Sequence, residues 1–202
     1  MTFVKYKWFS FFFGFFCVIK LFMKVIYRME NNNFFLKSTV SSKLTNNEIK
    51  QICMLKNKEW KFGIKSQLKW FKNNIKKFDL HNLFYIKSRL AGYTLLRKRT
   101  CKIENLKKNM HYLLFDTLII DKKYRRKKLS DLLMCFNNVT IKLSGLLSFL
   151  TCSNELVGFY KKNNWTKLNN KDFFVIDHSF STNGMVFNKK EDFKKFVFYI
   201  NL

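Results

Sequence analysis

Hydrophobic and polar positions follow two different spacings along the chain from residue 34 to residue 200. Apolar-rich extended runs predict strands, and apolar residues spaced three or four apart predict helices. The resulting order of elements is β-α-α-β-β-β-α-β-α-β-β. Strands are expected at 34–40, 80–86, 89–97, 110–121, 146–152, 173–177 and 185–188, and helices after Thr45 and at 65–75, 129–143 and 154–163; residues 196–200 are a candidate for one further strand.

Local signals support these assignments. Thr45 and Glu48 have the spacing of a capping box, and Gly145 is placed to end the helix 129–143. Residues 87–88 separate two extended runs and predict a hairpin. The strand 110–121 is apolar on both faces, which indicates a central, buried strand. The helix faces expected to enter the core are Leu68, Phe71 and Ile75 in one helix, and Leu132, Leu133, Phe136, Val139 and Leu143 in another.

Size and charge narrow the class of protein. The 202 residues suit one domain, with 25 Phe, no Pro and a net charge of +26. Coding by an AT-rich genome explains part of this bias, so the charge is not a functional signal by itself. A body this basic nevertheless attracts anions, and a phosphate-bearing partner is expected rather than a polycation. No specific nucleic acid is expected.

The cysteines and histidines form no metal-binding pattern. None of the five cysteines has C-x-x-C spacing, and the three histidines lie far from them in sequence. We therefore expect no metal, and reduced, mostly buried thiols in a cytoplasmic protein. The residues concerned are Cys17, Cys53, Cys101, Cys135 and Cys152, with His81, His111 and His178.

Residues 1–28 are treated as a separate segment. An apolar run at 8–19 is flanked by lysines and is shorter than the roughly 20 residues a span requires. It suits a signal peptide or signal anchor, a membrane-surface helix through residues 8–27, or a translation start that is really Met29. We favour the last, with a domain at 29–202. Removing residues 1–28 lowers the net charge from +26 to +21, so the domain itself is basic.

Two short motifs carry a family resemblance. Residues 124–130 read YRRKKLS, and residues 159–165 read FYKKNNW. The first resembles the (Q/R)-x-x-G-x-(G/A) loop, and the second the F-Y-x-x-x-G-F stretch, of the GNAT N-acetyltransferase superfamily. The segments 67–70 and 81–83 further resemble the aminoglycoside 2′-acetyltransferase-like and nodulation acyltransferase-like branch. The resemblance implies an α+β (mixed α/β) fold with a central mixed twisted sheet flanked by helices.

The basic loop has its own physical interpretation. A strand that enters a helix through a tight loop exposes backbone N–H groups that bind phosphate. CoA carries such phosphates, so the cradle is expected to hold acetyl-CoA as co-substrate. A solvated basic loop or a nucleic-acid patch is the alternative. The residues assigned to the cradle are Arg125, Arg126, Lys127, Lys128, Leu129 and Ser130.

Two positions in this loop depart from the family pattern. Lys128 replaces the family's glycine, and Ser130 stands where the family has Gly or Ala. We expect Lys128 to fit only with an ordinary backbone conformation and an outward side chain. Asn164 replaces the second motif's glycine and tolerates a left-handed backbone.

Further site residues follow from the resemblance. The backbone of Leu118, Ile119 and Ile120 would donate to the thioester carbonyl. Tyr160 would hydrogen-bond the CoA sulfur and protonate the leaving thiolate, although a half-buried structural tyrosine is the alternative. A polar residue near the pantetheine arm corresponds to Ser153 or Asn154. A helix N-cap is an equal alternative for Ser153.

Asp116 is the carboxylate of most interest, because it interrupts an otherwise apolar strand. We expect it to be buried and on the same face as Leu118, where it acts as general base or binds the acceptor amine. A structural ion pair is an equal alternative. Asp121 is interpreted as a turn residue, and His81 and His178 are weaker candidates for the base.

The leading hypothesis is acetyl transfer from acetyl-CoA to a primary amine of a small, anionic acceptor such as an amino sugar, within a ternary complex. The alternatives are a basic nucleic-acid-binding module, with aromatic residues between lysines at 56–77, a catalytically degenerate GNAT-like protein, and a membrane-anchored protein. The first hypothesis predicts that strands 110–121 and 146–152 run parallel and separate at their C-terminal ends.

Overall fold

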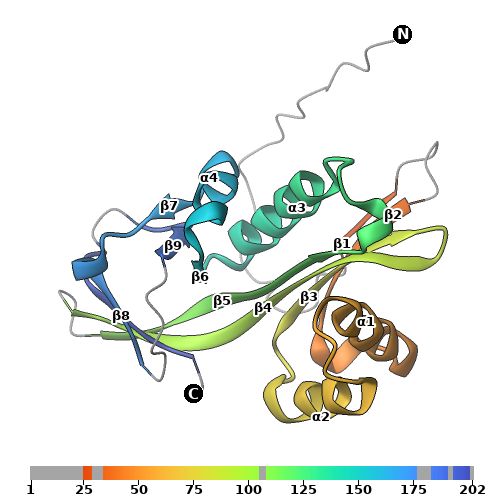
Figure 1. Ribbon diagram of the computed structural model, residues 1–202. Helices are drawn as coiled ribbons and strands as arrows, with labels where there is room; N and C mark the ends of the chain where they lie inside the picture. Colours follow the sequence, from red (N-terminus) through yellow and green to blue (C-terminus); the bar gives the residue numbers. More distant parts are fainter. Residues whose placement is uncertain (1–24, 29–33, 105–107, 177–182, 191–192, 201–202) are drawn as a thin grey trace, which may run out of the picture.

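A long antiparallel hairpin of β4 (Arg89–Ile103) and β5 (Lys108–Ile120) runs through the centre of the molecule (Figure 1). The structure is a computed structural model that describes residues 25–28, 34–104, 108–176, 183–190 and 193–200. Within these residues the strands form one mixed sheet in the order β1-β2-β3-β4-β5-β6-β9-β7. Strand β10 pairs with the far end of β4, and β8 pairs in parallel with β10.

The first half of the sheet is an antiparallel meander. β1 (Val25–Arg28), β2 (Phe34–Val40) and β3 (Leu80–Ile86) lead to β4. The turn residues Lys87 and Ser88 both have positive φ, 46° and 62°, which suits a tight hairpin, so the predicted hairpin is confirmed.

Helices cover both faces of this half. α1 (Asn46–Glu59) and α2 (Ile64–Asn74) lie below the sheet in Figure 1, and α3 (Leu129–Ser144) lies above it. The capping box of α1 is present, because Glu48 N–H donates to Thr45 Oγ1 and Thr45 N–H donates to Glu48 Oε2. Gly145 ends α3 with φ 69°, as predicted.

The second half extends from β5 through β6 (Leu147–Cys152) and α4 (Asn154–Lys162). Short strands then complete it. They are β7 (Thr166–Lys167), β8 (Phe173–Ile176), β9 (Asn183–Phe187) and β10 (Phe196–Tyr199), with a 3-10 turn at Asn170–Asp172 between β7 and β8; further 3-10 turns follow β2, at Ser41–Lys43, and β5, at Lys122–Tyr124. β4 and β5 are therefore the only strands of the described chain that pair with strands of both halves.

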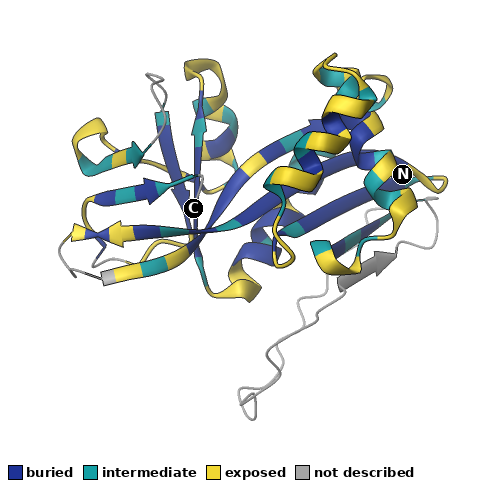
Figure 2. Cartoon of the chain, turned by 90° about the horizontal axis from the view of Figure 1, so that it is seen from below, coloured by how far each residue is buried: buried dark blue, intermediate teal, exposed yellow. Residues whose placement is uncertain are grey.

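The central strands are buried and the helices expose their outer faces (Figure 2). Two of the predicted helix faces are partly wrong. Leu68 and Leu143 are exposed, at 39% and 57%, while Gln67 and Asn137 are buried in their helices. The spacing of apolar residues could not predict which polar side chains are buried, because these side chains are stabilised in the core by hydrogen bonds to residues outside their own helices.

One such network joins the sheet to α3. Asn82 Nδ2 donates to Thr94 Oγ1 and to Asn137 Oδ1, both at 3.0 Å. Thr94 Oγ1 donates to Asn137 Oδ1 at 2.8 Å, and Thr140 Oγ1 donates to Asn82 Oδ1 at 3.1 Å. Mutual hydrogen bonds offset most of the cost of burying these groups, although Nδ2 of Asn137 has no described partner.

The predictions about the cysteines and about residues 1–28 have mixed outcomes. Cys53, Cys101 and Cys152 are buried thiols and Cys135 is exposed; Cys17 and His178 lie outside the described residues. Val25–Arg28 belongs to the segment that the sequence suggested was separate, yet it forms β1 against β2. Residues 1–24 lie outside the described part, so their role stays a prediction. No described helix is long and apolar enough to cross a membrane.

Candidate active site

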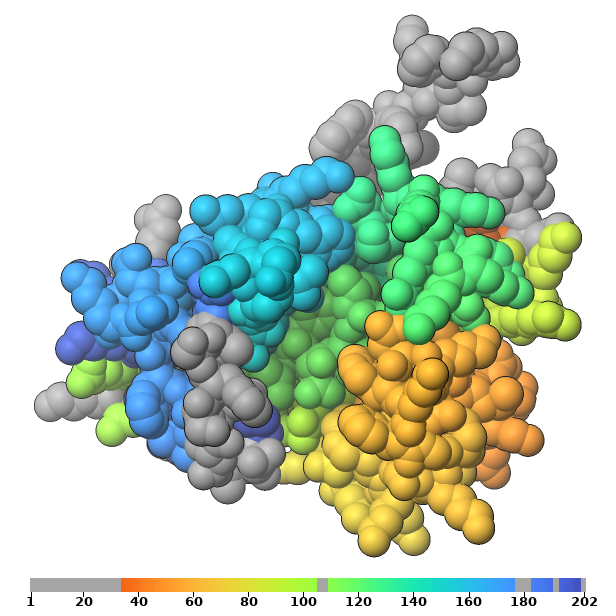
Figure 3. All heavy atoms as spheres, in the orientation of Figure 1, coloured from red at the N-terminus to blue at the C-terminus, as the bar shows by residue number. Residues whose placement is uncertain are grey.

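β5 and β6 run parallel but pair over only three residues. The pairs are Tyr112 with Leu147, Leu113 with Ser148, and Leu114 with Phe149. Both strands continue beyond these pairs without further partners to each other, so the predicted separation is confirmed. Figure 3 shows a hollow with atoms of β5 at its base. The helices α1 and α2 (orange to yellow) lie on one side of it, and β6 with α4 (cyan) lies on the other. From Phe115 onward, β5 pairs with β4 alone among the described strands. Alternate backbone N–H groups on its other edge therefore have no strand partner and can donate to a ligand. Leu118, Ile119 and Ile120 lie in this stretch.

A β-bulge lies within the same stretch. Leu96 pairs with Phe115 and Leu95 pairs with Thr117, so Asp116 is one residue more than β4 can match. Leu118 packs against the side of the sheet that α3 covers, whereas Asp116 and Thr117 line a cavity on the α1–α2 side. The expectation that Asp116 shares a face with Leu118 is therefore wrong, because the bulge reverses the alternation.

Asp116 also differs from expectation in its burial. Its side chain is 23% exposed, and it forms an ion pair with Arg97 at 3.5 Å. A carboxylate in this position is accessible to a ligand in the cavity while it remains next to the open edge of β5.

The loop before α3 contains a run of backbone N–H groups without acceptors in the described chain. Arg126 and Lys128 have left-handed φ values of 63° and 55°, and Lys128 is the N-cap of α3. The expectation of an ordinary backbone at Lys128 is thus wrong. The left-handed conformation explains why glycine suits this position. Within the described chain, the N–H groups of residues 126–130 have no hydrogen-bond acceptor, so together with the helix dipole they can hold an anion.

The basic side chains of the loop fall into two groups. Arg125, although exposed, is paired: its Nε donates to the carbonyl of Ile120 at 3.0 Å and its guanidinium pairs with Glu59 of α1. Arg126, Lys127 and Lys128 are exposed and form no ion pair with a described residue. Arg125 therefore fixes the end of β5, and the other three supply positive charge. Leu129 and Ser130, half-buried, begin α3.

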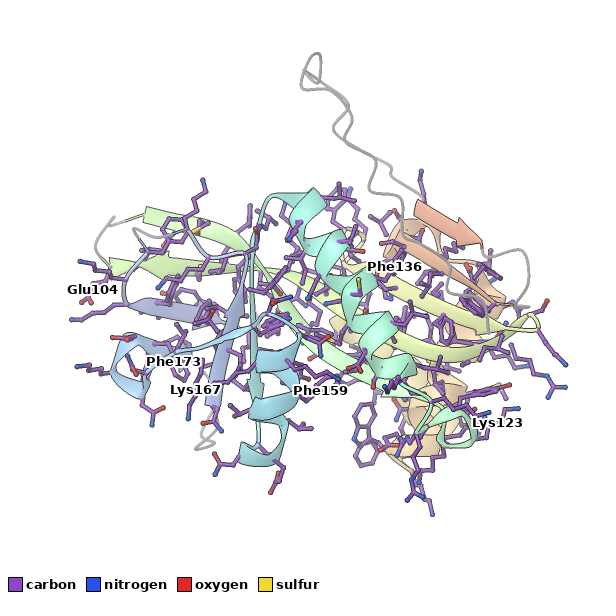
Figure 4. All side chains as sticks on the ribbon, turned by 90° about the horizontal axis from the view of Figure 1, so that it is seen from above. Glu104, Lys123, Phe136, Phe159, Lys167 and Phe173 are labelled. Atoms are coloured by element: carbon purple, nitrogen blue, oxygen red, sulfur yellow. The ribbon has the colours of Figure 1, made fainter. Side chains whose placement is uncertain are left out.

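Tyr160 lies on α4, on the opposite side of the sheet from Asp116. Figure 4, viewed from above, shows α4 with Phe159 beside α3, and Lys123 in the loop before α3. Tyr160 is 8% exposed, and its ring meets that of Phe115 at 6.2 Å between centroids. Burial, assisted by the nearby Cys152, raises the pKa of Tyr160 to about 12. Its phenol stays protonated at neutral pH and makes no hydrogen bond to a described residue.

The remaining candidates occupy the start of α4. Ser153 is the N-cap in position, but its hydroxyl accepts no bond from a helix N–H and instead donates to Glu155 Oε2 at 2.5 Å. Asn154 Oδ1 accepts from Asn183 Nδ2 at 2.9 Å. Both residues follow the diverging end of β6. Asn164 has φ 65°, so asparagine takes the left-handed position of the second motif.

A cavity of about 320 Å³ opens on the α1–α2 side of the bulge. Sequence reasoning singled out Asp116 there, but it linked the aromatic residues at 56–77 only with nucleic-acid binding and residues 67–70 only with a family branch, not with a cavity at Asp116. One signal for this cavity was available in the sequence: Lys56 occupies a position on the apolar face of α1. The lining residues are Lys56, Trp60, Phe62, Ser66, Gln67, Trp70, Asp116 and Thr117.

The other candidate bases have structural roles. His81 is fully buried, with its two ring nitrogens bonded to Ser41 Oγ and Tyr93 Oη, both at 2.8 Å. Burial, assisted by the charge of Lys56, lowers the pKa of His81 to about 3. Asp121 is a turn residue, as predicted, and accepts from Lys123 N–H at 3.2 Å. Burial alone would raise the pKa of Asp121, but the bond from Lys58 and that from Lys123 bring it below its ordinary value.

A mixed sheet whose two central parallel strands separate beside the N-terminus of a helix defines the GNAT acyl-CoA N-acyltransferase fold, and this chain has that fold. Solved structures agree. YhbS, a GNAT family N-acetyltransferase from Escherichia coli in complex with CoA, has a TM-score of 0.62 at 10% identity over 86% of this chain and 93% of its own. An acyl-CoA N-acyltransferase from Pseudomonas aeruginosa has a TM-score of 0.55 at 12% identity, over 75% and 97%.

Escherichia coli ElaA has a TM-score of 0.54 at 13% identity, again over 75% of this chain and 97% of its own. No protein-family model matches the chain, and no curated protein matches it in sequence. The branch suggested by residues 67–70 and 81–83 stays a prediction.

Proposed function

We propose that the chain is an N-acetyltransferase that moves an acetyl group from acetyl-CoA to a primary amine of a small acceptor, amino sugars included. The separation of β5 and β6 after Leu114 carries this proposal. Beyond their three pairs the two strands share no partners, and in this proposal the acyl arm of the donor enters there, between the N–H cradle and Tyr160 on one face and the cavity at Asp116 on the other. A donor and an acceptor can thus meet from opposite faces in a ternary complex.

The cradle residues fit the phosphates of CoA. The N–H groups of residues 126–130 supply donors without intramolecular acceptors, and Arg126, Lys127 and Lys128 supply charge. Bound acetyl-CoA supplies an activated acyl group. The open edge of β5 at Leu118, Ile119 and Ile120 supplies N–H groups that polarise the acyl carbonyl.

The chemistry balances with two side chains. The neutral amine forms a bond to the acyl carbon, the carbon–sulfur bond breaks, and the thiolate leaves. Asp116 accepts the proton lost by the amine, directly or through water, and Tyr160 donates a proton to the thiolate. Solvent then restores both groups. A raised pKa keeps Tyr160 in the form that can donate.

Calorimetric titration of CoA and acetyl-CoA into the full chain, with a polynucleotide as comparison, tests the proposal. We expect saturable CoA binding, a raised melting temperature, and acetyl transfer to at least one amine of a small-molecule panel. Salt-dependent polynucleotide binding without CoA binding would instead support the basic-module alternative. The aromatic residues at 56–77 speak against that alternative, because Trp60, Phe62 and Trp70 line the cavity rather than a flat surface.

A further inference from the structure

Lys56 has an unusual environment for a lysine. It is 6% exposed on the inner face of α1, and its ammonium lies 3.5 Å from the ring centroid of Trp70 and 5.8 Å from that of Trp60. It makes no hydrogen bond or ion pair with any described residue. Aromatic rings attract a buried ammonium but supply no hydrogen-bond acceptor, so part of the cost of burial stays uncompensated.

A second buried cation lies beside it. Arg97 is 6% exposed, its guanidinium is 5.8 Å from the Trp70 ring, and its Nε has no partner. Its ion pair with Asp116 is long, at 3.5 Å, and so is the bond that its Nη2 donates to the carbonyl of Asn74, also at 3.5 Å. Arg99, two residues along β4, shows the contrast. Its guanidinium donates to Asp79 at 3.1 Å and to backbone carbonyls as well, so this fold can fully pair a buried arginine.

The charges around the cavity therefore do not cancel. Two cations, Lys56 and Arg97, face one carboxylate, Asp116, which leaves an excess of one positive charge beside the cavity. The rest of the lining is aromatic or neutral. Trp60 and Phe62 are exposed, at 38% and 72%, where the loop between α1 and α2 meets the cavity. A site of this kind suits a small molecule with one negative charge and an apolar body.

We infer that the acceptor is an amino acid or a close analogue, whose carboxylate binds Lys56, whose amine lies at Asp116, and whose apolar side chain contacts Trp60 and Phe62. This inference rests on the proposed function and names its acceptor class. A carboxylate supplies the hydrogen-bond acceptor that Lys56 lacks, and one negative charge matches the excess. A phosphate carries more charge than the single positive charge in excess here.

Burial of Lys56 supports the assignment. Desolvation lowers the pKa of its amine, Arg97 lowers it further, and Asp116 and Cys53 act in the opposite direction. A bound carboxylate would favour the charged form, so ligand binding and the charge of Lys56 strengthen each other.

Matched pairs of acceptors test the inference directly. Phenylalanine is compared with phenethylamine, and leucine with isoamylamine, since the members of each pair differ only in the carboxylate. Glucosamine represents acceptors without an acid. Release of CoA is followed by chromatography, because the exposed Cys135 would react with a thiol reagent. We expect kcat/KM for each acid to exceed that of its decarboxylated partner by about 10-fold or more, as a charged hydrogen bond allows.

Three variants identify the residue responsible. Lys56→Met keeps the apolar stem and should abolish the preference, chiefly by raising KM for the acids about 10-fold or more. Lys56→Arg should restore part of it. Lys50→Met is the control, because Lys50 is exposed on the same helix. CoA titration of each variant checks that it is folded.

The outcomes separate this inference from the proposed function. Equal rates for acids and decarboxylated amines, a preference for glucosamine, or an unchanged preference in Lys56→Met would overturn the inference while transfer itself stands. No transfer to any member of the panel despite CoA binding would contradict the transferase function, and the inference would fail with it.

Discussion

Lys128 is the loop residue whose replacement gives the sharpest test of the structure. It adopts φ 55° and ψ 17° at the N-cap of α3, a left-handed conformation that costs a residue with a side chain about 1–2 kcal/mol. Lys128→Gly removes that strain but gives the unfolded chain more freedom, which costs about 0.5–1 kcal/mol. The variant should therefore be more stable by roughly 0.5–1 kcal/mol. For a chain of this size, that raises the melting temperature by a few degrees.

Lys127 provides a matched control. It is an exposed lysine in the same loop, and its φ is not positive. Lys127→Gly removes the same charge without relieving strain, so it should lose about 0.5–1 kcal/mol. Urea unfolding of both variants measures the difference, which is expected to be about 1–2 kcal/mol. Lys128→Ala, which removes the charge but keeps the strained backbone, shows how much the charge contributes.

Two results would refute the reasoning. Equal stability of Lys128→Gly and Lys127→Gly would mean that the left-handed backbone carries no strain. A gain in Lys128→Ala as large as in Lys128→Gly would assign the effect to charge. CoA affinity gives an independent measurement, because a glycine at position 128 lets a phosphate approach the cradle more closely. We expect that affinity to rise or stay level.

Further predictions concern the core and the reaction. Gly92→Ala should destabilise the protein by about 1–3 kcal/mol, because its Cβ would lie 2.7 Å from Ile120 Cδ1; Gly158→Ala, with open space around it, should be neutral or stabilising in the same thermal unfolding measurement. Tyr160→Phe should lower kcat by about 100-fold while CoA binding, measured by calorimetry, stays unchanged. A loss of CoA binding instead would indicate a structural tyrosine. Because the folded-state pKa of His81 is below that of the unfolded chain, the unfolded state takes up the proton first, and stability should fall by about 2 kcal/mol from pH 7 to pH 5. His81→Gln should remove most of that fall in urea unfolding, and an unchanged fall would contradict the buried neutral histidine.

The elements that the sequence predicted best have strong local signals. The capping box at Thr45, the turn at Lys87 and Ser88, and the glycine after α3 each follow from the chemistry of one or two residues. The two short strands β1 and β7 were not predicted. They are only a few residues long and owe their form to their neighbours in the sheet.

The site was harder to predict for a physical reason. The loop before α3 and Tyr160 were named from motifs, because adjacent residues build them. The cavity at Asp116 is instead formed by α1, α2 and β5, which are distant in sequence, and a lysine at an apolar position of α1 was its one local signal. The face of Asp116 was mispredicted because a single bulge residue reverses the alternation of the strand, and nothing local in the sequence announces a bulge.

The bulge at Asp116 also bears on how this protein could change by mutation. Loss of one codon, that of Asp116, would bring Phe115 and Thr117 into direct succession, opposite Leu96 and Leu95 as they already are. Every core side chain of β5 would keep its face, so the hairpin would become regular without repacking. A deletion is usually the most damaging of small genetic changes within a strand. At this codon it would preserve the register of the hairpin but remove the carboxylate that faces Lys56 and Arg97, so the backbone would tolerate a loss that the two buried cations would not.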